Sequence, residues 1–262
     1  MRFIFKTSYA QDINLTKHGG HVFWYGALAL LLAAAPWLFA EYWLAQLTFI
    51  LIYAIVGLGL MLLAGFTGQF SLGHAAFLGV GAYTQAVFTN MGLPFPLALA
   101  LAAGISAAVG VVVGLPALRL KGIYLGIATI AFGFIVEEGF ARWESVTGGN
   151  SGMSVKSPEI FGWVLSSAAE FYMLCLLIAI AATLGILNLL RSSTGRAFVA
   201  IRDSEISAQS MGINLARYKT LSFAISAALA GVAGALYAHK LRFISPDQFN
   251  ILQSIDLLLM VV

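Results

Sequence analysis

Charged side chains are scarce in this chain. Of its 262 residues only 10% are charged and 60% are hydrophobic, and the mean hydropathy is +0.92. A water-soluble domain usually carries about 25% charged residues, so these few charges cannot cover the surface of a soluble globule. The composition excludes a cytosolic enzyme, a nucleic-acid-binding protein and a disordered chain, and the net charge of +3 is too small for a nucleic-acid footprint. It indicates a polytopic membrane protein.

The chain has a single cysteine and lacks the sequence motifs of nucleotide hydrolysis, of redox cofactors and of a proton relay. The single Cys175 excludes an intrachain disulfide and a cysteine-based metal site. The sequence has no G-x-x-x-x-G-K-[ST] phosphate loop, no Cys/His cluster and no row of intramembrane acids. Glu137, Glu138 and Asp256 are the acids that can lie at membrane depth, where ionisable residues are candidates for a functional role. The alternative for Glu137 and Glu138, which fall near a predicted outer interface, is that they face lipid headgroups or an aqueous vestibule. We therefore expect no catalytic residue, no metal site and no bound cofactor in this chain.

Long apolar runs predict an all-α, polytopic helical bundle, because a spanning helix needs about 20 mostly apolar residues. The Leu72–Thr89 run is rich in glycine and alanine and predicts either a full span or a short helix entered through a broken segment. Ile255–Val262 is too short to span, so we expect a truncated eighth helix that continues beyond this sequence. The seven predicted spans are Val22–Ala40, Leu44–Ala64, Leu72–Thr89, Phe95–Leu118, Ile123–Ala141, Phe171–Leu190 and Leu221–Ala238.

The basic residues indicate the orientation, since short cytoplasmic loops are enriched in Lys and Arg. With a cytoplasmic N-terminus and with Leu72–Thr89 counted as one crossing, ten of the 14 basic residues lie on the inner side. We expect residues 1–21 to form a cytoplasmic segment and residues 22–262 to form one transmembrane domain. The four basic residues left outside are Arg142, Lys156, Lys240 and Arg242.

The longest predicted cytoplasmic loop, Arg191–Lys219, has apolar residues at helical spacing. Asp203 or Ser204 can cap a second short helix, and Gly212 stands where a helix end favours a positive φ. Such a helix pair can insert into the cleft of a partner protein or rest on lipid headgroups. The spacing does not separate these two interpretations.

The stretch GFTGQFSLGHAAF (Gly65–Phe77) places glycines and polar side chains between two apolar runs. Irregular backbone at membrane depth persists only where protein or water satisfies it, and broken helices form binding and gating elements in transporters. An ordinary glycine-rich turn at the interface is the alternative. On the first interpretation, the candidate residues of a translocation path are Gly68, Gln69, Ser71, Gly73 and His74.

Four stretches resemble one known family: Gly59–Thr84, Gly122–Glu138, Thr147–Met153 (TGGNSGM) and Gly195–Asn250. They are similar in sequence and order to the LivM-type permease subunits of branched-chain amino acid ABC transporters. The resemblance implies an ABC importer permease fold in the plasma (inner) membrane of a bacterium, in a subunit without an ATPase site. It also implies four kinds of partner: a second homologous permease subunit, two ATP-binding cassette subunits, a periplasmic or extracellular solute-binding protein, and the lipid bilayer.

The resemblance also gives Arg191–Lys219 a role as the coupling segment, which importers of this class set into the ATPase subunit. The family's core of Glu-Ala-Ala, three residues and Gly corresponds to Ile206-Ser207-Ala208 and Gly212, with Ile206 at the Glu position. The implied ATPase-coupling residues are Ser207, Ala208 and Gly212. Glu205 stands one residue early and receives no specific role.

The function implied by the resemblance is ATP-driven, receptor-dependent import of branched-chain (aliphatic) amino acids. Few intramembrane charges suit a zwitterionic, aliphatic substrate, and they suit urea, short amides or other amino acids equally well. An ion-coupled secondary transporter is the alternative from another class. That alternative predicts an inverted internal repeat, and the two halves of the sequence show no convincing self-similarity.

Overall fold

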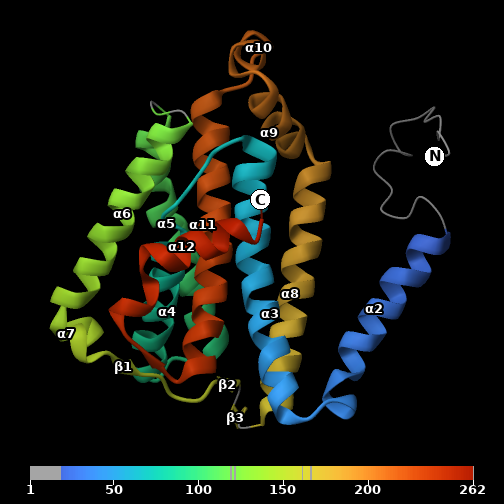
Figure 1. Cartoon of the computed structure of the whole chain (residues 1–262), viewed down its shortest axis with the longest axis vertical. Coiled ribbons are helices and arrows are strands. Elements are labelled where there is room, and N and C mark those ends of the chain that lie inside the picture. The colour runs from blue at the N-terminus through green and yellow to red at the C-terminus, as the bar shows by residue number, and fades with distance from the viewer. Residues whose placement is uncertain (1–18, 119, 121, 161, 166, 262) are drawn as a thin grey trace.

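The computed structural model describes residues 19–118, 120, 122–160, 162–165 and 167–261 (Figure 1). Residues 1–18 of the predicted cytoplasmic segment lie outside the described residues. Each of the seven apolar runs contains a long helix, which confirms an all-α membrane bundle. The long helices are α2 (Gly19–Leu38), α3 (Glu41–Leu60), α4 (His74–Asn90), α5 (Phe95–Ala117), α6 (Ile123–Arg142), α8 (Ala168–Arg191) and α11 (Leu215–Leu241).

Short elements connect the long helices. The structure also contains two two-residue β ladders, β1 with β4 and β2 with β3, both antiparallel, which the sequence analysis did not foresee. The short helices are η1 (Met61–Phe66), α7 (Glu144–Thr147), η2 (Gly149–Ser151), α9 (Ser193–Asp203), α10 (Glu205–Ser210), η3 (Pro246–Phe249) and α12 (Ile251–Leu259). The strands are β1 (Met153–Ser154), β2 (Glu159–Ile160), β3 (Trp163–Val164) and β4 (Phe243–Ile244).

Five helices within the described residues are long and apolar enough to cross a membrane. The helix α4 has only 17 residues and begins at His74, so it is shorter than the predicted Leu72–Thr89 span. The apolar part of α2, Phe23–Leu38, is also too short to be counted among these five. The five are Glu41–Phe66, Phe95–Pro116, Ile123–Arg142, Ala168–Arg191 and Leu215–Leu241.

The helix α11 lies at the centre of the bundle and packs on α3, α4 and α5 (Figure 1). Small residues allow its backbone to approach its neighbours closely. A Cβ atom at Gly234 would overlap the carbonyl oxygen of Leu78, and one at Gly81 would overlap the backbone of Gly231. The core is therefore organised around the crossings of α11 with α4 and α5.

The flanking helices α2 and α6 present large apolar side chains outward. Trp37 on α2 is 80% exposed and Ile135 on α6 is 72% exposed. Such faces are typical of a protein whose surroundings are lipid or another membrane subunit.

The two ends of the bundle differ in character (Figure 1). The helix α10 projects at one end, and α7 with β1 to β3 lies at the opposite end. The predicted eighth run, Ile255–Val262, overlaps α12, which begins four residues earlier at Ile251 and ends at Leu259. The helix α12 lies at a steep angle across the long helices (Figure 1). There the backbone N–H of Ala75 donates to Ser254 Oγ at 3.0 Å, which attaches α12 to the first turn of α4.

Candidate functional site

The Gly65–His74 segment begins where α3 widens into the π-helix η1. The carbonyl of Leu63 accepts two hydrogen bonds, from Thr67 Oγ1 at 2.6 Å and from the backbone N–H of Gln69 at 3.0 Å. Between them Gly68 adopts φ +68°, a left-handed conformation that ends helices and favours glycine. The segment therefore leaves the helix through a defined turn at the position that its glycines predict.

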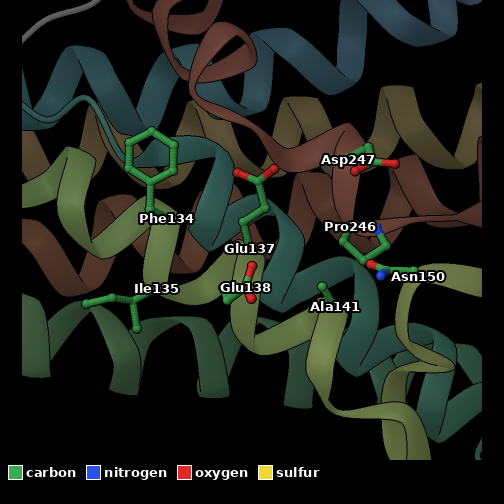
Figure 2. A pocket seen from close by; sticks show the side chains of 8 residues that line it. All are labelled: Phe134, Ile135, Glu137, Glu138, Ala141, Asn150, Pro246 and Asp247. Atoms are coloured by element: carbon green, nitrogen blue, oxygen red, sulfur yellow. The ribbon is translucent and has the colours of Figure 1, made fainter.

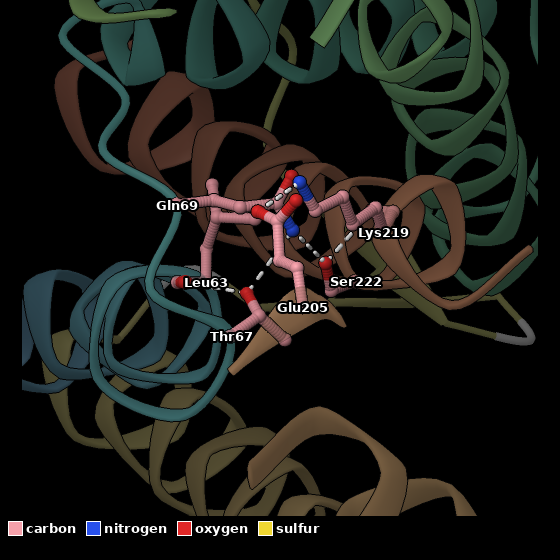
Figure 3. Close-up of polar contacts among 6 residues, drawn as sticks. All are labelled: Leu63, Thr67, Gln69, Glu205, Lys219 and Ser222. Carbon is pink, nitrogen blue, oxygen red and sulfur yellow. Dashed lines mark hydrogen bonds and ion pairs between the residues drawn. The ribbon is translucent and has the colours of Figure 1, made fainter. Parts of the chain in front are cut away.

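The side chain of Gln69 is buried in the middle of this segment (Figure 3). Its Nε2 donates to Ser222 Oγ on α11 at 2.8 Å and to Thr67 Oγ1 at 3.2 Å. Its Oε1 is buried and has no hydrogen-bond partner among the described residues. Buried polar atoms are nearly always paired, so Gln69 keeps one unused acceptor inside the bundle.

The end of the segment is fixed by His74, Ser71 and Gly73. The His74 ring forms hydrogen bonds with Ser71 Oγ at 3.0 Å and with Ser226 Oγ of α11 at 2.7 Å. Gly73 lies so close to α6 that a Cβ atom there would overlap the carbonyl oxygen of Thr129. Because the polar side chains are buried and bonded to other helices, the interpretation as a turn at the interface is disfavoured.

The coupling segment folds as the two predicted helices, α9 and α10. Ser204, rather than Asp203, caps α10, and its Oγ accepts a hydrogen bond from the backbone N–H of Ser207 at 3.3 Å. Gly212 adopts φ +84°, and its N–H donates to the carbonyl of Gln209 at 3.0 Å. The cap and the glycine stop are both confirmed.

The tip of the coupling segment is apolar and exposed. Ile206 is 79% exposed and Met211 is 84% exposed. Of the three predicted coupling residues, Ser207 and Gly212 are exposed, whereas Ala208 is buried. The residues of the family pattern therefore lie on α10 and in the turn that follows it. Ala208 faces inward there, whereas the apolar side chains of Ile206 and Met211 face outward.

Two contacts that the sequence analysis missed join the coupling segment to the rest of the bundle. The ammonium group of Lys219 on α11 is paired with Glu205 Oε1 at 2.5 Å, and Lys219 is only 3% exposed. The guanidinium of Arg202 on α9 donates to the carbonyl of Gly65 at 3.0 Å. The only signal in the sequence for the first contact is a pair of opposite charges 14 residues apart, which specifies no geometry.

An acidic cleft lies at the opposite end, between α6 and η3 (Figure 2). Glu137 on α6 and Asp247 in η3 both line it, and Glu138 is paired with Arg142 at 2.5 Å. Both glutamates therefore line an open space, which favours the vestibule interpretation. The cleft has a volume of about 630 Å³ and is lined by Phe134, Ile135, Glu137, Glu138, Ala141, Asn150, Pro246 and Asp247.

The polar side chains at the two ends of the described bundle differ from a typical metal-ligand set. Within the described residues, no group of three or more His, Cys, Asp or Glu side chains is placed to hold a metal ion. The polar groups of the Gly65–His74 segment are an amide, hydroxyls and an imidazole, which suit hydrogen bonding to a small polar solute.

Comparison with known proteins finds relatives that belong to a single family. Residues 42–262 match the family described as "branched-chain amino acid transport system / permease component". The chain is 35% identical to the high-affinity branched-chain amino acid transport system permease proteins LivM of Salmonella typhimurium and Escherichia coli, over 90% of this chain and 61% of each relative. It is 30% identical to a probable LivM of Methanocaldococcus jannaschii, over 54% of this chain and 41% of that protein. No solved structure gives a significant match.

The chain thus spans about three fifths of the length of its LivM relatives from the two bacteria. The family match nevertheless covers α3 to α12, which include the Gly65–His74 segment, the coupling segment and the acidic cleft. The chain is a multi-pass membrane protein and belongs to the family of permease components of branched-chain amino acid transport systems.

Proposed function

We propose that this chain is a permease subunit of an ATP-driven, receptor-dependent importer of branched-chain (aliphatic) amino acids in the plasma (inner) membrane of a bacterium. In this proposal it forms the translocation path together with a second, homologous permease subunit. The observation that carries the proposal is the coupling segment: α10 projects from the bundle with an exposed apolar tip, and α9 contacts the Gly65–His74 segment through Arg202.

The chain supplies no ATPase site of its own, so two ATP-binding cassette subunits would hydrolyse the ATP. They would bind α10 through Ser207, Gly212 and the exposed apolar side chains, with Ala208 supporting the helix from within. The N-terminal segment and Arg191–Lys219 would then lie on the cytoplasmic side, with seven spans between and around them. A solute-binding protein would deliver the substrate from the other side.

The proposed translocation path runs along Gly68, Gln69, Ser71, Gly73 and His74. Its buried polar groups are uncharged dipoles that bond to Ser222 and Ser226 of α11, and the core around them also contains many apolar side chains. A zwitterion with an aliphatic side chain can be matched by such a mixture without a fixed counter-charge. ATP binding would bias the bundle between inward-facing and outward-facing states, because only a ligand with different affinities for two states shifts their populations.

Uptake of labelled leucine into proteoliposomes tests this proposal. The vesicles would contain the full-length chain with its partner subunits, with ATP inside, the solute-binding protein outside and all ion gradients collapsed. Uptake that requires both ATP and the solute-binding protein supports the class and the substrate together. ATP-dependent uptake of urea but not of leucine keeps the class and changes the substrate, and uptake driven by an ion gradient alone overturns the proposal.

A further inference from the structure

The coupling helix α10 and the path residue Gln69 are joined by consecutive polar contacts through the first turns of α11 (Figure 3). We infer that Glu205, Lys219 and Ser222 are positioning residues that convert a displacement of α10 into a change at Gln69. These four residues are called the coupling link below. The inference rests on the proposed function, because it assigns a route for the coupling that an ATP-driven importer requires.

The first contact of the coupling link is the ion pair between α10 and α11. Lys219 is almost completely buried, and its ammonium group lies against the Glu205 carboxylate. A buried charge that loses its partner is strongly unfavourable. The start of α10 therefore cannot move away from α11 unless Lys219 follows it or a new partner replaces Glu205.

The second contact begins at the backbone of the same residue. Ser222 Oγ donates to the carbonyl of Lys219 at 2.8 Å and accepts from Gln69 Nε2 at 2.8 Å. The helical turn that holds the ammonium group thus also holds the Gln69 side chain. Lys219, Ser222 and Ser226 lie on one face of α11, at i, i+3 and i+7, and Ser226 continues the row to His74.

The side-chain oxygen of Gln69, which is unpaired within the described part of the chain, indicates that this residue can change its hydrogen bonds and does not only fill space. Its Nε2 has two partners, whereas its buried Oε1 has none among the described residues. A rearranged Gln69 can therefore gain a hydrogen bond that this conformation lacks. Two alternative arrangements of one side chain are what a transmitted conformational change requires.

The test measures leucine uptake and ATP hydrolysis in the same proteoliposomes, with the full-length chain and its partner subunits. The variants are Glu205→Gln, Ser222→Ala and the double variant. Glu159→Gln is the matched control, because it makes the same chemical change at an exposed carboxylate in β2, outside the coupling segment. Ser222→Ala deletes only one oxygen and introduces a good helix former, so it keeps the test decisive if Glu205→Gln lowers the amount of protein in the membrane.

If the coupling link transmits the motion of α10, each single variant lowers the ratio of leucine taken up to ATP hydrolysed by about fivefold or more. Fivefold is the lower end of typical coupling effects. The double variant shows no larger loss than the worse single variant, because breaking either of two contacts in series interrupts the same route. The control Glu159→Gln keeps the ratio of the unmodified protein. Multiplying effects in the double variant, an unchanged ratio in Ser222→Ala, or a proportional fall in uptake and hydrolysis would each overturn the inference. Absence of ATP-dependent uptake by the unmodified complex would instead refute the proposed function.

Discussion

Replacement of Gly73 by alanine tests how closely the Gly65–His74 segment must approach α6. Gly73 precedes α4 with φ −115°, a conformation that alanine adopts readily, so the cost of the change is steric. The new Cβ would overlap the carbonyl oxygen of Thr129 and lie 3.0 Å from its carbonyl carbon. These atoms belong to the backbone of a long helix, which cannot yield as a flexible side chain can.

The magnitude follows from the nature of this obstacle. Overpacking in a filled core lowers the free energy of unfolding by about 1–3 kcal/mol. Because the obstacle here is backbone, we expect a loss of about 3 kcal/mol for Gly73→Ala. The start of α4 cannot simply retreat, because the N–H of Leu72 donates to Thr129 Oγ1 at 2.9 Å and would lose this partner. With roughly 2–4 °C of melting temperature per kcal/mol, we expect a decrease of about 6–12 °C.

The assay is thermal unfolding of the purified full-length chain in detergent, followed by leucine uptake after reconstitution. Gly104→Ala on α5 is the matched control, since a Cβ atom there meets nothing within 4 Å. It should be neutral or stabilising by up to about 1 kcal/mol. If Gly73→Ala melts at the temperature of the unmodified protein, the close contact between the start of α4 and α6 does not exist as described.

Three further changes test the site. Gly212→Pro should abolish uptake while membrane insertion is kept, because proline cannot adopt φ +84°; normal uptake at normal abundance would contradict the coupling role. His74→Leu should lower uptake without loss of ATPase-subunit binding, and unchanged uptake kinetics would make His74 a packing residue. Met211→Glu should weaken copurification of the ATPase subunits about tenfold, whereas the exposed Met91→Glu at the opposite end should not; equal effects would refute the apolar docking tip.

The helices were predictable because their signals are local. Hydropathy alone located all seven long helices, with ends that differ by up to six residues. The hydroxyl of Ser204 marked the start of α10, and the missing side chain of Gly212 marked its end. The largest error is at the start of α11, which begins at Leu215 instead of Leu221, because Arg217 and Lys219 hide its first turns from a hydropathy pattern. A second error lies at the end of α3. The helix of α3 continues through the π-turn to Phe66, beyond its predicted end at Ala64, because Leu63 finds partners in the residues that follow.

The contacts between segments were not predictable in the same way. Glu205 was set aside because it misses the family position by one residue, yet its place in the first turn of α10 directs it to Lys219. That direction depends on the turn at Gly212 and on how α10 folds back on α11. Likewise, a glycine in an apolar run predicts a close approach between two helices, but it does not predict which residue lies opposite, such as Leu78 for Gly234.

The central helix α11 is held in two different ways along its length. Near α10 the side chains of Lys219, Ser222 and Ser226 form polar contacts. The backbone of α11 packs closely on Gly110 and Gly114 of α5 in the same region, and on α4 through Gly231 and Gly234 farther along. Hydrogen bonds exchange partners at little net cost, but a close-packed crossing cannot separate without opening a void. The polar partners of α11 near α10 can therefore be exchanged while its close packing against α4 and α5 is kept.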